Sequence, residues 1–492
     1  MLYIGVDLGT SAVKLLLMDE KGRIQKIVSR DYPISFPKPG WSEQNPEDWL
    51  RETLEGISDL TDSCNKNEIA GIGCCGQMHG LVILDGNDRV IRPAILWNDG
   101  RSAEETDYLN NTIGKEKLSE YTANIAFAGF TAPKLLWVKK HEPENFAKIS
   151  KIMLPKDYIN YMLTGEFSTD VSDASGTLLF DVKNKCWSNE MLNICGLRSE
   201  QLPRIYESYE SVGTLTESTA RILGLSKNVK VCAGAGDNAG AAVGTGTVGN
   251  GRCNISLGTS GTVFISGKEF GVDSSNGLHS FAHADGNYHL MGCMLSAASC
   301  NKWWQQNIIE TSDYKGEEKK ITDDLLGKNH VFFLPYLMGE RSPINDVNAR
   351  GMFIGMTMDT KRIDMTQAML EGVAFGIRDS VEAARKTGIK IERSKICGGG
   401  AKSLLWKKIF ANVLNMNIDT VETEEGPGYG GAVLAAVACG VWNSVEDAAE
   451  KLVKLKDTVP PDPEIAALYE ERYAQFRLIY PAVKELFPKL KT

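Results

Sequence analysis

Two apolar runs near the start of the chain, residues 3–6 and 13–18, flank the turn-forming stretch DLGTS at residues 7–11. About half a chain length later, the runs 254–255 and 262–265 flank a similar stretch, SLGTS, at residues 256–260. A β-branched run, a tight polar turn and a second apolar run predict a β-hairpin. The repeat therefore predicts one hairpin near the start of each of two related domains.

Further apolar runs predict the elements around these hairpins. Residues 69–74 and 81–84 are β-like, and QMHG at residues 77–80 lies between them as a loop at a strand end. Residues 229–232 (VKVC) predict a short buried strand before a glycine-rich turn, GAGDNAG, at residues 234–240. The stretch LLWKKIFANVL at residues 404–414 has apolar residues three and four apart, which predicts a helix.

The glycine-rich stretch at residues 244–252 (GTGTVGNGR) precedes the second hairpin and is the expected junction and hinge. We place the domains at residues 1–248 and 249–492. A further glycine-rich turn at residues 426–431 is expected to be mainly structural, and AVLAAVACG after it to form a closely packed helix.

Composition narrows the class of protein. The 492 residues have an ordinary globular composition, and the net charge of -9 does not favour a nucleic acid or an anionic membrane as partner. The longest apolar runs are shorter than the roughly 20 residues that cross a bilayer. The strand-like start, MLYIGVDLGT, does not resemble a signal peptide, so we expect a cytoplasmic protein. The eleven cysteines contain no C-x-x-C pair and indicate neither a zinc site nor a disulfide framework.

The stretch GAGDNAG partly fits the dinucleotide-binding pattern G-x-G-x-x-[G/A]. However, residues 238–268 contain no acidic residue to bind a ribose hydroxyl, and the carboxylate of Asp237 would repel a pyrophosphate. The chain also lacks the P-loop and protein-kinase motifs. The two G-T-S turns offer backbone N–H groups and hydroxyls to phosphate oxygens, and the glycines at residues 398–400 allow close approach to a flat ligand.

Two hairpins of this kind in one chain resemble the actin-like ATPase architecture, also called ribonuclease-H-like. Residues 129–137 (GFTAPKLLW) and 351–371 resemble the two signatures of the FGGY family of carbohydrate kinases, and the similarity runs from residue 3 to about 440. Residues 41–44, 96–101, 154–158 and 334–341 are similar to members that act on D-xylulose. The resemblance implies an α/β fold with two ribonuclease-H-like domains flanking a central cleft. It also implies that the domain at residues 1–248 has the sugar site and the catalytic base and that the domain at residues 249–492 has the ATP site.

The same resemblance implies ATP-dependent phosphorylation of the 5-hydroxyl of D-xylulose with Mg²⁺. Asp237 matches the base that accepts the proton of the sugar hydroxyl, and Asp7 matches the aspartate that helps to hold Mg²⁺, usually through water. The expected sugar contacts are Met78, His79, Trp97, Asn98, Asp99, Arg101 and Asn238. The expected ATP contacts are Thr10, Ser11, Gly258, Thr259, Ser260 and Gly261 at the phosphates and Gly399, Gly400 and Ser403 at the adenosine. A homodimer is expected by analogy only.

Two alternatives stay open at this point. The acceptor could be another sugar or polyol, such as ribulose, fuculose, gluconate or glycerol, because such kinases share their nucleotide parts and differ in the sugar pocket. The fold could also serve an actin-like ATPase without a small acceptor. That hypothesis leaves the resemblance at the sugar site unexplained.

Overall fold

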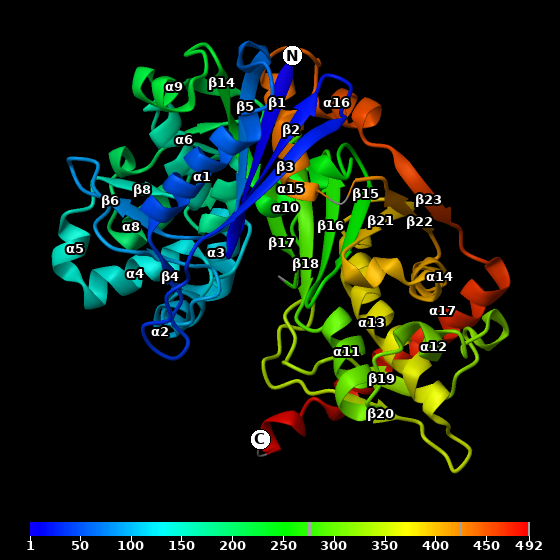
Figure 1. Cartoon of the computed structure of the whole chain (residues 1–492). Helices are drawn as coiled ribbons and strands as arrows, with labels where there is room; N and C mark the ends of the chain where they lie inside the picture. Colours follow the sequence, from blue (N-terminus) through cyan, green and yellow to red (C-terminus); the bar gives the residue numbers. More distant parts are fainter. Residues whose placement is uncertain (274, 276, 424, 491–492) are drawn as a thin grey trace.

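The computed structural model describes residues 1–273, 275, 277–423 and 425–490, and it contains two large mixed β-sheets, one in each half of the chain (Figure 1). The first sheet has the order β13 (Ser211–Thr214), β14 (Lys230–Gly236), β5 (Ile69–Gly76), β1 (Leu2–Leu8), β2 (Ala12–Asp19), β3 (Ile24–Asp31). The second has the order β17 (His279–Ala282), β18 (Tyr288–Met294), β16 (Gly261–Gly267), β15 (Arg252–Leu257), β21 (Arg393–Cys397), β22 (Asn417–Val421), β23 (Leu455–Val459).

Both sheets are built on the hairpins that the sequence predicts. β1 and β2 are antiparallel with Leu8 opposite Val13, and β15 and β16 are antiparallel with Leu257 opposite Gly261. In each sheet a parallel strand follows beside the hairpin, β5 next to β1 and β21 next to β15. The repeated topology confirms the α/β fold with two domains of the actin-like ATPase type.

Helices cover both faces of the first sheet. On one face lie α1 (Pro46–Thr61) and α6 (Pro155–Thr164), and on the other lie α10 (Asp237–Gly244) and α15 (Gly426–Ala438). α1 begins where the sequence offers a cap and a favourable first residue: the Asn45 side chain accepts the N–H of Glu47, and Pro46 occupies the first turn. Its Trp49 is fully buried against the sheet, which fixes the helix by apolar burial.

Residues 426–431 are not a turn, as the sequence suggested, but the first part of α15. The glycines are needed there for close packing rather than for a bend, because a Cβ on Gly430 would lie 1.9 Å from the carbonyl oxygen of Gly240. A Cβ on Gly5 of β1 would likewise lie 1.8 Å from the carbonyl oxygen of Gly428. α15 thus belongs to the second half of the sequence but packs on the first sheet. The following α16 (Val445–Leu452) packs on α15 and α10, the helices that cover this sheet.

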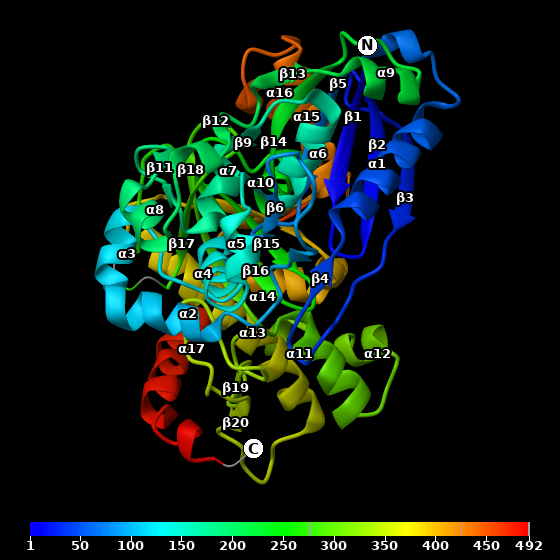
Figure 2. The same ribbon diagram turned by 90° about the vertical axis from the view of Figure 1, so that its left-hand side faces the viewer.

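The second sheet is covered on one face by α13 (Arg362–Arg385), α14 (Leu404–Leu414) and α17 (Pro463–Val483). α14 has the predicted bounds: Ser403 caps it by accepting the N–H of Trp406, and Asn415 ends it in the left-handed conformation. The termini lie at opposite ends of the molecule (Figures 1 and 2). Among the described residues, no helix combines the length and the apolar character that a membrane span needs.

Smaller elements connect the two sheets and their covering helices. In the first half the smaller helices and strands include β4 (Glu43–Gln44), β6 (Val82–Leu84), β7 (Ala94–Ile95), α2 (Ala103–Asp107), α3 (Lys115–Thr122), α4 (Thr131–His141), α5 (Pro143–Ala147), β8 (Lys151–Met153), β9 (Ser168–Asp170), α7 (Val171–Ala174), β10 (Phe180–Asp181), β11 (Cys186–Trp187), α8 (Asn189–Cys195), β12 (Arg204–Tyr206) and α9 (Glu217–Leu223). In the second half they include α11 (Ala298–Trp303), α12 (Tyr314–Glu318), β19 (Phe332–Leu334) and β20 (Met352–Ile354).

Candidate active site

A cleft of about 750 Å³ opens between the start of α10 on one side and the ends of β15, β21 and β22 on the other. Its lining includes Asp237, Asn238, Ser256, Gly399 and Pro427. A neighbouring cavity of about 610 Å³ shares Gly399 and Lys402 with it and continues toward α12 and α14. Together the two cavities form a track from Asp237 to an apolar pocket.

Asp237 occupies the first position of α10, directly after β14. The strand runs on through Gly236 and the helix begins at Asp237, so the glycine-rich turn expected at residues 234–240 is a strand end followed directly by a helix. Asp237 Oδ1 accepts hydrogen bonds from the backbone N–H (2.7 Å) and the side-chain amide (3.0 Å) of Asn238. Burial raises the pKa of Asp237 to about 6, although the two bonds from Asn238 act to lower it. The carboxylate is therefore ionised at neutral pH and more basic than an ordinary aspartate.

Asp7 lies near the end of β1, opposite Lys14 of β2 and Cys75 of β5. Burial, and secondly the charge of Asp237, raise the pKa of Asp7 to about 7. Lys14 opposes this shift, but its ammonium group is also paired with Glu425 at 2.8 Å. Two carboxylates close enough for their charges to repel each other are a donor set that suits a hard divalent cation.

A buried network supports the strand end before Asp237. The Gly236 N–H donates to Ser172 Oγ (3.2 Å), and Ser172 Oγ donates to Asp170 Oδ2. Asp170 Oδ1 in turn pairs with the fully buried Lys156 ammonium at 2.9 Å. Sequence reasoning did not find this network, because its members acquire meaning only through contacts between separate elements.

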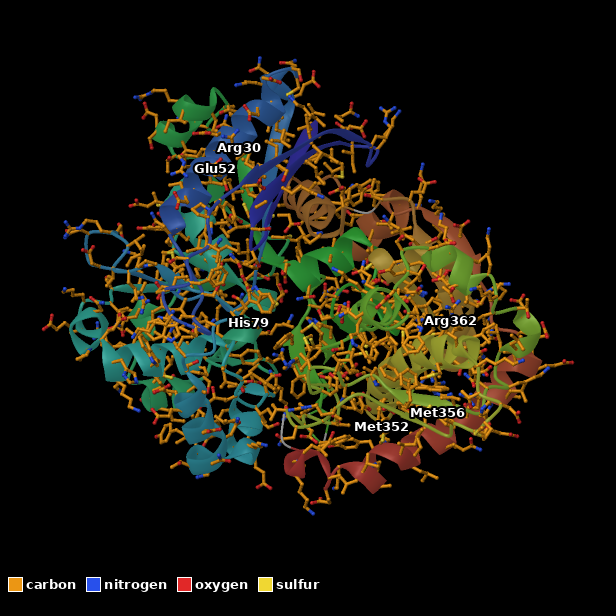
Figure 3. All side chains as sticks on the ribbon, turned by 60° about the horizontal axis from the view of Figure 1, so that its bottom comes forward. Arg30, Glu52, His79, Met352, Met356 and Arg362 are labelled. Atoms are coloured by element: carbon orange, nitrogen blue, oxygen red, sulfur yellow. The ribbon has the colours of Figure 1, made fainter. Side chains whose placement is uncertain are left out.

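His79 lies in the loop between β5 and β6, as predicted, with a positive φ of 68°. Nδ1 lies 2.7 Å from the carbonyl oxygen of Gly176, which can only accept, so Nδ1 carries the proton and Nε2 is left as an acceptor. The ring stacks on Phe130 at 4.7 Å between centroids. Burial, and then the charge of Lys134, lower the pKa of His79 to about 3, so the ring is neutral. In Figure 3 His79 lies on the side of the first half that faces the second.

The other expected sugar contacts divide into two groups. Met78 is buried next to the start of α10, with its sulfur 3.9 Å from the side-chain amide of Asn238, and so joins the His79 loop to Asp237. Trp97 is 46% exposed and donates to Thr10 Oγ1 at 3.0 Å, and Asn98 beside it is exposed.

Asp99 and Arg101 are placed differently from these neighbours. Their side chains are almost fully buried and form an ion pair with each other at 2.7 Å. Arg101 also pairs with Glu43 at 2.7 Å and stacks on Trp41, and Asp99 accepts the backbone N–H of Ser42. Both charged groups already have protein partners, which fix the backbone of the Trp97 loop.

The two G-T-S turns are held by different neighbours. In the first turn, the carbonyl oxygen of Thr10 accepts from Gln44 Nε2 at 2.7 Å, and Ser11 is exposed. In the second turn, between Leu257 and Gly261, the carbonyl oxygen of Thr259 accepts from the Ala297 N–H (3.0 Å) and Ser299 Oγ (2.7 Å) at the start of α11. Thr259 and Ser260 are both accessible. Each turn therefore has a fixed backbone. Ser11, Thr259 and Ser260 are exposed, whereas the Thr10 hydroxyl already accepts a hydrogen bond from Trp97.

The third glycine-rich turn lines the apolar part of the track. Gly399, Gly400 and Ser403 all border the 610 Å³ cavity, together with Leu404 and Leu405. Ser403 Oγ donates to Glu318 at 2.7 Å while it caps α14. The structure thus places the three residues expected at the adenosine in one cavity, next to the cleft that contains Asp237.

Arg341 was not singled out by sequence reasoning. It comes from the second half, yet its guanidinium lies over the ring of Phe127 at 5.4 Å, and its charge contributes to the lowered pKa of His79 and of His279. Among the described residues its guanidinium has no ion-pair or hydrogen-bond partner. Only its inclusion in a stretch of family resemblance, residues 334–341, could have drawn attention to it.

Comparisons with known proteins agree with this geometry. The model of the FGGY family of carbohydrate kinases, N-terminal domain, matches residues 2–244, and that of the C-terminal domain matches residues 253–439. A xylulose kinase from Escherichia coli (strain K12) is 39% identical over 97% of this chain and 98% of its own.

Two solved structures superpose over nearly the whole chain. That of a xyloylose kinase from Brucella ovis has a TM-score of 0.93 and 39% identity, and covers 99% of this chain and 100% of its own. That of a gluconate kinase from Lactobacillus acidophilus has a TM-score of 0.94 and 27% identity, and covers 100% and 99%. The two domain matches and the full-length relatives show that the chain belongs to the FGGY family of carbohydrate kinases.

Proposed function

We propose that the protein transfers the γ-phosphoryl group of ATP to the 5-hydroxyl of D-xylulose. The observation that carries the proposal is the contact of Met78 with Asn238, the residue next to Asp237 at the start of α10. The contact places the Met78-His79 loop beside the expected base in a chain with full-length xylulose kinase relatives. A phosphoryl acceptor site needs a base within reach of a bound hydroxyl. In this arrangement Asp237 is the base, and the neighbouring Met78-His79 loop holds the sugar that carries the hydroxyl.

Asp237 acts as the general base in this proposal. An alcohol is a weak nucleophile, and a carboxylate of pKa about 6 accepts its proton more readily than an ordinary aspartate as the new P–O bond forms. The Asn238 amide holds one carboxylate oxygen and leaves the other for the sugar. The bond between Gly236 and Ser172 keeps the start of α10 in place, which maintains the orientation of the base.

The sugar is held by groups of the first half. His79 contributes Nε2 as an acceptor for a sugar hydroxyl, Met78 packs against the sugar chain, and Asn238, Trp97 and Asn98 line the same region. Asp99 and Arg101 act through the backbone, because their ion pair fixes the loop that carries Trp97 and Asn98.

ATP lies along the track of the two cavities. Thr10, Ser11 and the run from Gly258 to Gly261 offer hydroxyl and N–H donors to the phosphates, and the adenosine occupies the cavity at Gly399, Gly400 and Ser403. Asp7 is the protein group that would hold Mg²⁺, and the raised pKa values of Asp7 and Asp237 fit a site that gains from a positive charge. When bound, Mg²⁺ supplies charge neutralisation at the β- and γ-phosphates.

A gluconate acceptor is the second candidate. It is favoured by Arg341, an unpaired cation near His79 that would suit a carboxylate, and by the solved structure of a gluconate kinase with the same fold. An actin-like ATPase without an acceptor has no such support, because it gives the Met78-His79 loop no role.

A coupled assay of ADP release tests the proposal with D-xylulose, D-ribulose, gluconate and glycerol as acceptors. We expect kcat/KM to be highest for D-xylulose and ATP turnover to stay low without an acceptor. A higher kcat/KM for gluconate would assign the second candidate. Turnover that does not depend on any acceptor would refute a kinase function.

A further inference from the structure

A separate cavity of about 460 Å³ lies at the opposite ends of the strands that border the active-site cleft. β15 contributes Ser256 to the cleft but Arg252 and Cys253 to this cavity, and β21 contributes Cys397 to the cleft but Arg393 and Lys395 here. The remaining wall comes from the junction at Gly246 and Val248 and from α16. Its volume lies within the range of small-molecule sites.

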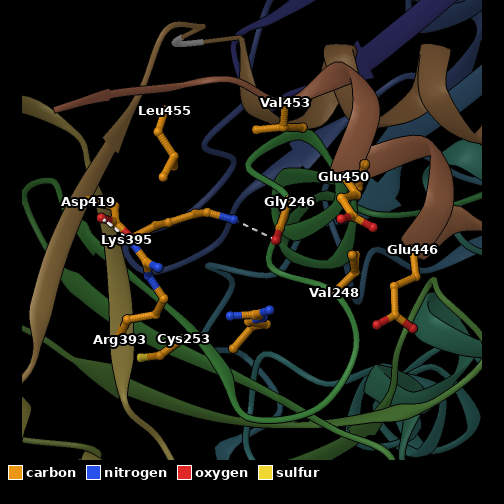
Figure 4. A pocket seen from close by; sticks show the side chains of 12 residues that line it. Gly246, Val248, Cys253, Arg393, Lys395, Asp419, Glu446, Glu450, Val453 and Leu455 are labelled. Atoms are coloured by element: carbon orange, nitrogen blue, oxygen red, sulfur yellow. Dashed lines mark hydrogen bonds and ion pairs between the residues drawn. The ribbon is translucent and has the colours of Figure 1, made fainter. Parts of the chain in front are cut away.

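One wall of this cavity is basic. Arg252 lies directly opposite Arg393 in the parallel pairing of β15 with β21. Lys395 follows Arg393 two residues later on the same strand, and Figure 4 shows both side chains at the cavity. Asp419 neutralises Arg393 through two hydrogen bonds of 2.7 and 2.8 Å. The Arg252 guanidinium has no partner among the residues that the structure describes. Like charges on adjacent strands destabilise a sheet, so this arrangement carries a cost that an anion would remove.

Lys395 connects this wall to the interdomain junction. Its ammonium group donates to the carbonyl oxygen of Gly246 at 2.5 Å, and Figure 4 shows this bond crossing the cavity. Burial, and then the charge of Arg252, lower the pKa of Lys395 to about 8. A single carbonyl oxygen is an incomplete set of partners for a partly buried ammonium group, which has three donors.

The opposite wall is acidic. Glu446 and Glu450 are one turn apart on α16, and both are exposed. Within the described part of the chain, neither carboxylate forms an ion pair with Arg252, Arg393 or Lys395, so the cavity separates the two charged walls. In Figure 4 the two glutamates lie across the cavity from Lys395 and Arg393.

We propose that this cavity binds a sugar phosphate. Its phosphate group would pair with Arg252 and Lys395, and its hydroxyls would donate to the carboxylates of Glu446 and Glu450. The two walls select this class together, because carboxylates accept hydrogen bonds and repel a bare anion, whereas the basic wall repels a cation. A neutral sugar would leave Arg252 and Lys395 without a charged partner.

Such a ligand would act on the enzyme by connecting a helix of the first domain's packing with strands of the second sheet. Through Val445, Ala448 and Ala449, α16 belongs to the apolar cluster of α15 and α10, the helices that cover the first sheet, whereas β15 and β21 are strands of the second sheet. A bound sugar phosphate would connect α16 to β15 and β21 next to the junction at Gly246 and Val248, and would fix the distance between them. We therefore expect it to lower kcat without competing with ATP, as a regulatory ligand.

Isothermal titration calorimetry tests the site on the full-length enzyme. An ATP analogue with a non-transferable terminal phosphate is kept at saturation. In the active site its terminal phosphate occupies the position that the phosphate group of D-xylulose 5-phosphate would take, so binding of this titrant reports on the other cavity. The titrants are D-xylulose 5-phosphate, inorganic phosphate and D-xylulose. The variants are Arg252→Gln and Glu450→Gln, with Arg198→Gln, an exposed arginine elsewhere on the surface, as the matched control.

We expect D-xylulose 5-phosphate to bind in saturable fashion and Arg252→Gln to weaken it about tenfold or more, since a charge-assisted contact is lost. Glu450→Gln should weaken the sugar phosphate but not inorganic phosphate, and Arg198→Gln should change neither. Absence of saturable binding, unchanged binding in Arg252→Gln, or equal affinity for inorganic phosphate would each overturn the proposal. These outcomes do not depend on the acceptor specificity of the active site.

Discussion

The turns after β1 and β15 have the same hairpin context but different chemistry. The first presents Asp7, whose carboxyl group is near that of Asp237, and the second presents Ser256 at the corresponding place, beside Cys397. Leu8 pairs with Val13 and Leu257 pairs with Gly261, so the loop of the second hairpin is shorter. This second loop also accepts backbone hydrogen bonds from the start of α11. The duplication therefore supplies a turn with hydroxyl groups twice but an acidic group once, which is consistent with a single active site.

The largest expected effect comes from removing the base on the acidic side of the cleft. Asp237→Asn keeps the shape of the side chain but removes its basicity, so kcat should fall roughly 10²-fold or more while ATP affinity changes little. Steady-state kinetics and calorimetric titration with an ATP analogue measure the two effects. Substantial activity in a correctly folded variant would contradict the assignment of Asp237 as the base.

Substituting the equivalent positions of the two turns, Asp7 and Ser256, sharpens the comparison between them. Asp7→Asn should lower kcat about 10²-fold and raise the Mg²⁺ concentration needed for half-maximal rate, because the hard oxygen ligand is lost. Ser256→Ala should change kcat only a few-fold, since a hydroxyl is one of several phosphate donors. Similar losses in both variants would show that the two turns share the same role.

Asp7 should also reduce stability, in contrast to Ser256. Its folded-state pKa, about 7, lies above the ordinary 3.8, so the folded state binds more protons between these values and stability falls as pH rises through this window. Asp7→Asn should therefore raise the free energy of unfolding by about 2 kcal/mol at pH 8 and by much less near pH 4. Urea unfolding at both pH values measures the difference. Ser256→Ala serves as the control, and a pH-independent gain in Asp7→Asn would refute this explanation.

The smallest expected effect concerns the proposal that the sugar binds to the first half of the chain and the adenosine of ATP to the second half. His79→Ala should raise the sugar KM about tenfold and leave the ATP KM nearly unchanged, since one hydrogen bond and a ring contact are lost. His79→Asn, which tolerates the positive φ of this position, separates loss of contact from backbone strain. Ser403→Ala is the counterpart at the nucleotide end. Equal loss for sugar and ATP in both His79 variants would indicate a structural histidine.

Much of this architecture could be predicted from local sequence. The two hairpins, the loop at residues 77–80 and the helix at residues 404–414 follow from apolar periodicity and turn residues, which act over a few positions. The segment at residues 426–431 was assigned wrongly for the same reason. Glycine and proline predict a turn locally, whereas the close approach of α10 and β1 makes glycine necessary inside a helix.

The site was predicted less completely than the fold. Family resemblance supplied Asp7, Asp237 and His79 as candidates, but it could not show that Asp99 and Arg101 are already paired with each other. Nor could it show that Arg341 reaches the region of His79 or that Ser172 supports Gly236. These contacts join residues that are distant in sequence, and no local pattern encodes them.

The sequence by itself determined the duplicated hairpins, the acidic character of one copy and the family. Only the tertiary structure decided that α15 packs on the first sheet and that α16 packs on α15 and α10. The basic ends of β15 and β21 therefore face Glu446 and Glu450 across a cavity. The physical reason is the range of the forces involved. Propensity and turn chemistry act between neighbours along the chain, whereas burial, close packing and the pKa of a carboxyl group depend on what surrounds a residue in space.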